Sequence, residues 1–454
     1  MNKRLTLCAL AILLLLTSPG FGCWSSSGAV KHNNLGINLG KESRYEEAIV
    51  EFSAAIELDT GYAEAYSNRS NAYFATGKYD KAIADSNRAI ELEPDYAEAY
   101  KNRGNAYFAT GEYDKAIADF SRAIELDPEL ILAYNNRGSA YNIKGEFDKA
   151  IADSDKAIEL DPEFVSAYSN RGFAYKRKGD IITAITNYDK VIELDPEFII
   201  AYNNRGSAYF TVGEYDKAIA DFERAIELDP YYAEVYNNRG STYNMKGQLD
   251  NAITDFNRAI ELDPDYVEAY NNRGDVYLAI GEYDKAMSDF NRAIELDHYY
   301  AEAYTNRGSA YSAMGRYDEA IVDFNKSIEL YPYYAEAYNY RGSVYYVVKR
   351  EYDKALSDFN RAIELDPDYA EAYTNRGLAY AARGEYSKAM SDFDRAIELD
   401  PDYANPYYGR ALVYDALDRK AEAIVNLEKC IELSHKQSLS QAAKVKLDEL
   451  QNQL

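Results

Sequence analysis

The stretch AYNNRGSAY at residues 133–141 recurs unchanged at residues 201–209, a distance of 68 residues. Sixty-eight is twice 34, and steps of 34 residues from Arg137 meet an arginine each time between residues 69 and 341. One extra residue then intervenes before Arg376 and Arg410, so the chain holds twelve copies of one unit, the first with Leu35 in place of arginine. A 34-residue unit is too small to fold alone and must bury a face against its neighbours. The sequence therefore predicts a solenoid.

The unit at residues 97–130 predicts two helices. Small and aromatic residues recur in it at spacings of three and four, which is the spacing of one helical face. Gly111 is expected to end the first helix, and Asp127-Pro128 the second, because the residue before proline is disfavoured in the helical region. Small residues are expected where the two helices touch. The faces consist of Tyr100, Gly104 and Tyr107 in the first helix and of Ala116, Phe120, Ala123 and Ile124 in the second.

All of these residues except Ile124 fall on positions 4, 8, 11, 20, 24 and 27 of the tetratricopeptide repeat, and Pro128 on position 32, so the chain resembles that family. Tyrosine replaces the usual tryptophan at position 4, and arginine the usual leucine at position 7. The resemblance implies an all-α fold, a right-handed superhelical α-solenoid of about twelve 34-residue helix-turn-helix repeats, which binds other proteins. The repeats are expected at 29–62, 63–96, 97–130, 131–164, 165–198, 199–232, 233–266, 267–300, 301–334, 335–369, 370–403 and 404–437, before a capping helix at 438–454.

The N-terminus has a different composition. A basic start precedes an apolar run at residues 5–16, too short to span a bilayer, which predicts a signal peptide at 1–22. Cys23 resembles the cysteine of a bacterial lipoprotein box, although Gly20 stands where leucine is usual. In that family the sulfur carries a diacylglyceryl group, so Cys23 is the expected lipid attachment site and 23–28 a tether. The alternative is ordinary signal cleavage, which would give a secreted or soluble periplasmic protein.

Net charge and residue spacing argue against several functions. The formal net charge is −26, so the chain should repel phosphate backbones, and nucleic acid is not an expected partner. The three histidines, His32, His298 and His435, share no repeat position. There is no phosphate-binding loop and no metal-ligand spacing, so no enzyme activity, metal or cofactor is expected. Cys430 stands where the repeat normally has alanine, which predicts a buried, inert thiol.

The second asparagine of the quoted stretch, Asn136, lies at repeat position 6, nearly opposite the packed face of its helix. In the family this opposite face lines the concave groove. Amides both donate and accept hydrogen bonds, so a row of them could bind an extended peptide, which resembles the asparagine ladder of O-linked N-acetylglucosamine transferase. The alternative is a row of merely solvated asparagines. The series comprises Asn34, Asn68, Asn102, Asn136, Asn170, Asn204, Asn238, Asn272, Asn306 and Asn375.

The arginine at position 7 is expected to be structural. Nine of the twelve repeats carry both this arginine and an aspartate at position 23, such as Arg103 and Asp119. Asn187 and Asn426 replace that aspartate in two others. Arginine can lay its stem on apolar surface while its head stays paired or hydrated, and the sequence leaves open whether the aspartate is the partner.

Repeats 4–6 depart from the acidic pattern of the groove. Position 2 is glutamate in most repeats but is Leu132, Ser166 and Ile200 here. Repeats 5 and 6 also add Phe173, Lys176, Arg177, Lys178 and Phe210. These residues predict an apolar and basic site for an acidic, aromatic segment of a partner. The alternative is sequence drift, with the cations favoured by the dipole at a helix C-terminus.

Repeats 9 and 10 contain a second unusual stretch. Six tyrosines crowd together there, at residues 331, 333, 334, 340, 345 and 346, and could stack on sugars, although such tyrosines usually pack repeats. One extra residue and a missing glycine predict a longer turn near residue 350. The sequence thus predicts a protein-interaction scaffold of the bacterial envelope, attached to a membrane only by a lipid. Its alternative is a glycan-binding or export-associated lipoprotein, and its oligomeric state is left open.

Overall fold

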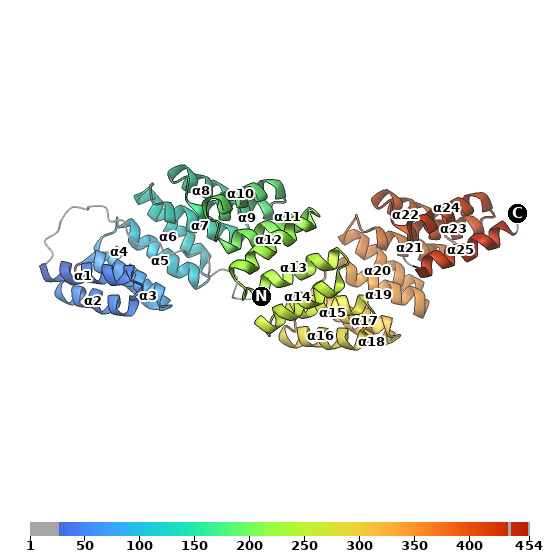
Figure 1. Ribbon diagram of the computed structural model, residues 1–454, viewed down its shortest axis with the longest axis horizontal. Helices are drawn as coiled ribbons and strands as arrows, with labels where there is room; N and C mark the ends of the chain where they lie inside the picture. The colour runs from blue at the N-terminus through green and yellow to red at the C-terminus, as the bar shows by residue number, and fades with distance from the viewer. Residues whose placement is uncertain (1–26, 435–436, 453–454) are drawn as a thin grey trace. The chain divides into compact units, whose positions relative to one another are not determined.

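The computed structural model describes residues 27–434 and 437–452. Within these residues the regular structure is entirely helical, in 25 α-helices and one short π-helix, which confirms the predicted all-α solenoid class. The helices form two compact units that divide between Pro230 and Tyr231. In each unit, antiparallel helix pairs stack one after another (Figure 1). The expected signal peptide and Cys23 lie outside the described residues.

Unit 1 consists of six helix pairs. We call the two members of each pair the first and the second helix of the repeat. The first helices are α1 (Ser27–Lys41), α3 (Ala63–Ala75), α5 (Ala97–Ala109), α7 (Ile131–Lys144), α9 (Val165–Arg177) and α11 (Ile199–Thr211). The second helices are α2 (Tyr45–Leu58), α4 (Tyr79–Leu92), α6 (Tyr113–Leu126), α8 (Phe147–Leu160), α10 (Ile181–Leu194) and α12 (Tyr215–Leu228).

Unit 2 repeats this arrangement and adds a last helix. Its first helices are α13 (Ala233–Met245), α15 (Val267–Ala279), α17 (Ala301–Ala313), α19 (Ala335–Val344), α21 (Ala370–Ala382) and α23 (Ala404–Ala416). Its second helices are α14 (Leu249–Leu262), α16 (Tyr283–Leu296), α18 (Tyr317–Leu330), α20 (Tyr352–Leu365), α22 (Tyr386–Leu399) and α24 (Lys420–Leu433). The last helix is α25 (Gln437–Gln451).

Within a repeat, the two helices meet through small residues, as expected. On α5, a Cβ added at Gly104 would stand 2.7 Å from the ring of Phe120 on α6. The ring therefore occupies space that only a glycine leaves open. Ala116 and Ala123, on the same face of α6, have no exposed surface. Close helix approach and one buried aromatic ring thus make the core of the repeat.

The extra residue of the tenth repeat widens a helix. α19 continues into the π-helix η1 (Tyr345–Lys349), and Arg350 then adopts left-handed backbone with φ of 54°. Nine other repeats have a left-handed glycine in this turn, for example Gly111 with φ of 81°. The predicted longer turn is therefore wrong. A π-turn takes up the extra residue while Tyr345 and Tyr346 stay packed beside buried Leu356.

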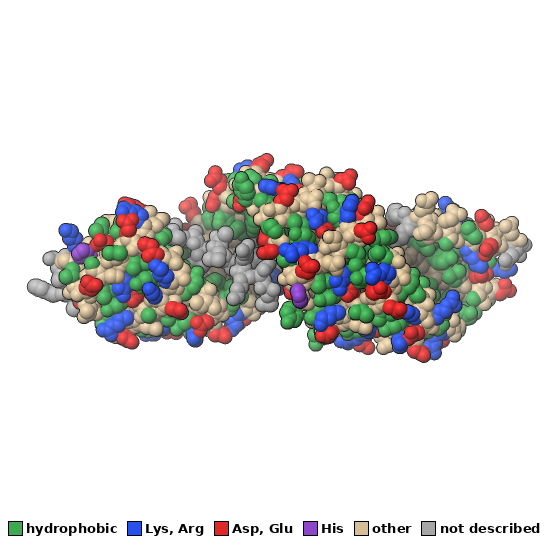
Figure 2. Space-filling model, turned by 90° about the horizontal axis from the view of Figure 1, so that it is seen from below, with side chains coloured by type: hydrophobic (Ala, Val, Ile, Leu, Met, Phe, Trp, Pro, Cys, Tyr) green, Lys and Arg blue, Asp and Glu red, His purple; other side chains and the backbone are tan. Residues whose placement is uncertain are grey.

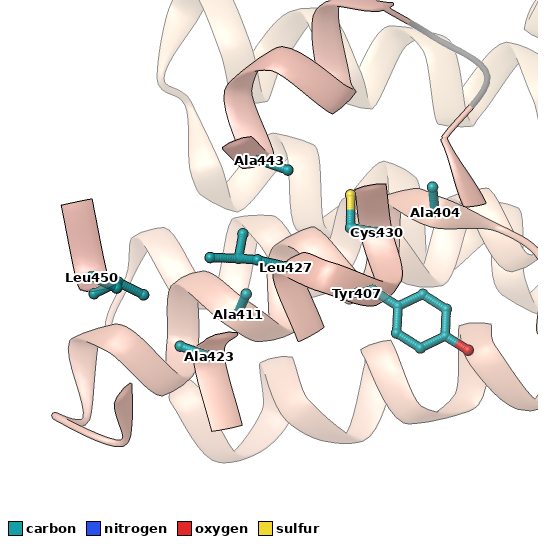
Figure 3. Close-up of a cluster of buried hydrophobic side chains, with 8 residues drawn as sticks. All are labelled: Ala404, Tyr407, Ala411, Ala423, Leu427, Cys430, Ala443 and Leu450. Carbon is teal, nitrogen blue, oxygen red and sulfur yellow. The ribbon is translucent and has the colours of Figure 1, made fainter. Parts of the chain in front are cut away.

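Helix α25 covers the last repeat. Its Ala443 and Leu450 are fully buried against Leu427 and Cys430 of α24 (Figure 3). Burial raises the pKa of the Cys430 thiol to about 11, so the thiol stays protonated at neutral pH. A protonated, buried thiol is a poor nucleophile, which agrees with the inert role predicted for it.

Candidate protein-interaction surface

The first helices line one side of each unit. Within each unit, every first helix contacts the first helices of adjacent repeats, as α15 contacts α13 and α17. The second helices make no comparable contacts with one another in the described residues. Each unit therefore curves with its first helices on the inside. We define the inner face by repeat positions 2, 5, 6, 9 and 12, which in α9 are Ser166, Ser169, Asn170, Phe173 and Lys176.

The asparagines at position 6 lie on the inner face and bind the preceding repeat. The Asn170 side-chain amide donates to Oδ1 of Asn135 at 2.8 Å and to Oγ of Ser139 at 2.9 Å. Neighbouring repeats are thus joined across the inner face. The same bond, at 3.0 Å, links Asn68 to Asn33, Asn272 to Asn237, Asn306 to Asn271 and Asn375 to Asn339, while Asn102 donates to Ser67 and Asn136 to Asn105.

These bonds change how the asparagine series is understood. In most members at least one amide hydrogen is already used, and Asn102 and Asn136 are buried. Asn204 is half-buried and its side chain makes no hydrogen bond within the described residues, whereas Asn34 is exposed and Asn238 is half-buried on α13. Peptide binding by the series stays a prediction, because the structure accounts for most of it as inter-repeat contacts. The sequence did not identify the asparagine at position 5 as the hydrogen-bond acceptor, although the recurring stretch NNR contains the asparagines of both positions 5 and 6.

The arginine at position 7 is structural, as predicted. Nine repeats pair it with the aspartate at position 23 through two bonds, as Arg307 with Asp323 at 2.7 and 2.8 Å. Another nitrogen of Arg307 reaches Asn291, on the second helix of the preceding repeat, at 2.7 Å. Where position 23 is asparagine, that preceding helix supplies the carboxylate, as Asp155 does for Arg171 at 2.6 Å. The other members are Arg69–Asp85, Arg103–Asp119, Arg137–Asp153, Arg205–Asp221, Arg239–Asp255, Arg273–Asp289, Arg341–Asp358 and Arg376–Asp392.

A tyrosine at position 34 and the glutamate at position 2 of the next repeat form a second inter-repeat contact. Asn339 donates to the Tyr369 hydroxyl and to Glu371 Oε1, both at 3.2 Å. In repeats 4–6 the tyrosine and the glutamate are lost together. The replacing pairs are Leu130 with Leu132, Phe164 with Ser166 and Phe198 with Ile200. The inner face therefore becomes less polar there through coupled substitutions.

Four apolar side chains remain partly exposed at inner-face positions of this stretch: Phe210 on α11, and three others that we call the apolar patch. The apolar patch consists of Leu132 on α7, Phe173 on α9 and Ile200 on α11, and Phe173 is 39% exposed. Next to them, Lys176 donates to Ser207 Oγ at 2.7 Å. Leu132, Phe173, Ile200 and Lys176, four of the residues predicted for this site, thus share the inner face, and partner binding by them stays a prediction.

The other residues predicted for this site have different neighbours. Phe210 packs on Tyr215, with ring centroids 5.8 Å apart, as the equivalent phenylalanines of repeats 2 and 3 do. Arg177 lies over the ring of Phe147 at 6.0 Å. Lys178 pairs with Asp148. The three cations therefore have different surroundings, and of them Lys176 is the one beside the patch.

The crowded tyrosines of repeats 9 and 10 also separate. Tyr331 and Tyr333 lie in an exposed loop with ring centroids 6.2 Å apart. Tyr345 and Tyr346 pack on the α20 core. Tyr334 and Tyr340 remain, half-buried near the inner face. The six side chains therefore form no single platform for a sugar ring.

The described parts of the chain contain neither a metal-ligand cluster nor a membrane-spanning helix. No group of three or more metal-ligating side chains occurs in residues 27–434 and 437–452. No helix within those ranges is long and apolar enough to cross a membrane. His32 pairs with Glu51 at 2.6 Å, and His435 lies outside the described residues.

Comparison with known families finds the same repeat along most of the chain. A model described as TPR repeat matches residues 41–77, 70–111, 138–179, 174–213, 240–281 and 274–315. Models described as tetratricopeptide repeat match residues 97–130, 199–232, 222–254, 301–334, 344–405 and 404–436. No curated protein matches the chain significantly.

Two solved structures show similar folds at low sequence identity. The APC/C hetero-tetramer Cut9–Hcn1 matches with a TM-score of 0.53 and 17% identity, over 92% of this chain and 96% of that one. Yeast Tom70 matches with a TM-score of 0.47 and 19% identity, over 94% and 96% of the two chains. At such identities the likeness to Cut9–Hcn1 concerns the fold alone.

Proposed function

This chain belongs to the tetratricopeptide repeat family, and from that premise we propose that it is a non-catalytic scaffold which binds segments of other proteins on its inner face. A similar fold occurs in the Cut9–Hcn1 hetero-tetramer, which is an assembly of several chains. Stacked repeats present long curved surfaces, and such surfaces suit extended partners.

The apolar patch is the observation that carries this proposal. Elsewhere the inner face is largely occupied by hydrogen bonds between repeats, whereas the patch offers aliphatic and aromatic surface. Aromatic side chains dominate binding energy in protein interfaces, and a nearby cation adds selectivity. A partner segment with an apolar or aromatic anchor and a carboxylate therefore fits Phe173, Ile200 and Lys176 best.

Replacing Phe173 and Ile200 by serine is expected to weaken partner binding about tenfold or more, because two anchors lose their contact surface. Serine is compatible with both positions, since Ser207 and Ser166 occupy them in adjacent repeats. Partners crosslinked in the native cells would be identified by mass spectrometry, and their dissociation constants measured with both forms. The matched control is Ile182→Ser, which removes a 69% exposed apolar side chain from the second helix of the same repeat.

Equal loss of binding in the control, or none in the double variant, would contradict a role for the patch. Capture of polysaccharide without protein would favour the glycan alternative and reject the protein scaffold. Binding retained by the control and lost by the double variant supports the scaffold and locates its anchor site.

We also propose that the scaffold acts in a bacterial envelope, anchored through Cys23. The support is the order of a basic start, an apolar run and a small-residue stretch before this cysteine. Cells fed labelled palmitate should label the wild-type protein and not Cys23→Ala, whereas Cys430→Ala, the matched control, should be labelled like wild type. An unlabelled wild type, or equal labelling of Cys23→Ala, would leave ordinary signal cleavage as the explanation.

A further inference from the structure

The inner face of unit 2 carries a row of carboxylates that unit 1 lacks in its middle repeats. Glu268, Glu302, Glu336 and Glu371 are the second residues of α15, α17, α19 and α21. Asp275 lies two turns further along α15, at position 9. Positions 2, 5, 6, 9 and 12 of these four helices include no lysine or arginine. This stretch of the inner face therefore carries only negative charge.

The hydrogen-bond donors to these carboxylates are neutral groups. Glu302 accepts from the Tyr300 hydroxyl and from the Asn271 amide, both at 3.0 Å. No cation lies within 4.0 Å of the four glutamates or Asp275 in the described residues. On the outer helices the pattern is the opposite, since Glu329 pairs with Lys326 at 2.9 Å. On the face drawn in Figure 2, basic and acidic side chains are interspersed. What distinguishes this stretch of the inner face is that its carboxylates have no basic side chain beside them among the described residues.

Two tyrosines near these carboxylates have pKa values that the negative charges affect. The pKa of Tyr334 is raised by burial and by the charges of Glu302, Glu336 and Asp275. Burial and the same kind of neighbours raise the pKa of Tyr340 to about 12. Asp275, on α15, affects both tyrosines, so carboxylates from successive repeats act on the same stretch of the inner face.

Neighbouring atoms also affect the charge of Asp275. Its side chain is exposed by surface area, yet crowding by neighbouring atoms raises its pKa through desolvation. Carboxylates of one sign on a curved surface add their potentials, which favours a cationic partner.

We propose that the inner face of unit 2 binds an extended lysine- or arginine-rich segment of a partner protein. This inference rests on the proposed scaffold function and names the partner chemistry of a second surface. Cationic side chains would meet the carboxylates of Glu302, Glu336 and Asp275, and tyrosine rings beside them offer faces to cations. A bound metal ion is a poorer fit, because no group of three metal ligands occurs in the described residues.

The test uses a fluorescent peptide in which lysines alternate with alanines, titrated into the full chain and followed by anisotropy. Glu302→Gln, Glu336→Gln and Asp275→Asn are combined in one variant, since amides keep the acceptor atoms used by Tyr300 and Asn271. We expect binding to weaken by about tenfold or more, because charge-assisted contacts are stronger than neutral ones. Binding by wild type should also fall as salt rises towards about 0.15 M.

The matched control removes the same amount of charge from the outer surface. It combines Glu261→Gln, Glu295→Gln and Glu329→Gln, whose side chains are exposed on second helices of unit 2. Peptide affinity should stay within about twofold of wild type. Equal weakening in both variants would show attraction by net charge alone and overturn the proposal, as would no weakening in either.

The result of the lysine-peptide test can be distinguished from the result of the apolar-patch test. Phe173→Ser with Ile200→Ser should leave affinity for the lysine peptide unchanged, because those residues lie in unit 1. If the lysine peptide fails to bind wild type, or binds no better than a peptide with glutamate in place of lysine, this inference is wrong while the patch result stands. Loss of lysine-peptide binding in the patch variant would overturn the assignment to unit 2.

Discussion

Replacing Arg307 by alanine should lower the free energy of unfolding of the surrounding repeats by about 3–5 kcal/mol. The reason is the fate of Asp323, whose side chain is only 6% exposed and whose two oxygens both accept from Arg307. Without the arginine a carboxylate stays buried and uncompensated, and Asn291 of the preceding repeat loses its link. The change would be measured by urea unfolding followed by circular dichroism, with amide hydrogen exchange to locate the loss at α17 and α18.

Arg361→Ala is the matched control, because Arg361 pairs with Glu364 at 3.1 Å on the exposed side of α20. Such surface pairs contribute about 0.5 kcal/mol, so this variant should unfold almost like wild type. Combining Arg307→Met with Asp323→Leu should recover most of the stability, since removing both charges leaves no buried charge unpaired. Equal losses at Arg307 and Arg361 would show that the buried pair has no special role.

The repeat length and the helix faces predict the fold from sequence because they depend on periodicity alone. Gly104 and Phe120 recur at fixed positions, and one unit specifies how every copy packs. The turn near Arg350 could not be predicted in the same way. An inserted residue can lengthen a loop or widen a helix, and the choice depends on tertiary packing of Tyr345 and Tyr346, which periodicity does not encode.

The candidate site was less predictable, since it depends on contacts between neighbouring repeats. The asparagine at position 6 is a polar residue on an inner face, and from sequence a ligand or a neighbouring repeat could equally be its partner. For Asn170 the partner is the neighbouring repeat, because its side chain donates to Asn135, which lies 35 residues earlier, one repeat plus one position. The joint replacement of tyrosine and glutamate by Phe198 and Ile200 could have revealed such coupling. The coupling becomes visible only when position 34 of one repeat is compared with position 2 of the next repeat.

The second large effect concerns two glycines at the same repeat position that should respond to alanine with opposite signs. A Cβ at Gly206 would lie 2.8 Å from the ring of Phe222, which is 1% exposed and has little room to move. A Cβ at Gly138 would meet its nearest atom at 3.4 Å, because Ser154 replaces the ring there. Gly206→Ala should therefore lower the free energy of unfolding by about 1–3 kcal/mol through overpacking. Gly138→Ala should raise it by up to about 1 kcal/mol through helix propensity.

The twelfth repeat supplies a rescue for the damaged variant, since it carries Ala411 and Leu427 at the two positions and buries both. Combining Gly206→Ala with Phe222→Leu should therefore cost less than the sum of the single changes, as measured by a double-mutant cycle in urea. Additive losses would mean that Gly206 and Phe222 do not constrain each other. Stabilisation by Gly206→Ala would mean that the Phe222 ring moves aside. Packing against an aromatic ring would then not require glycine at this repeat position.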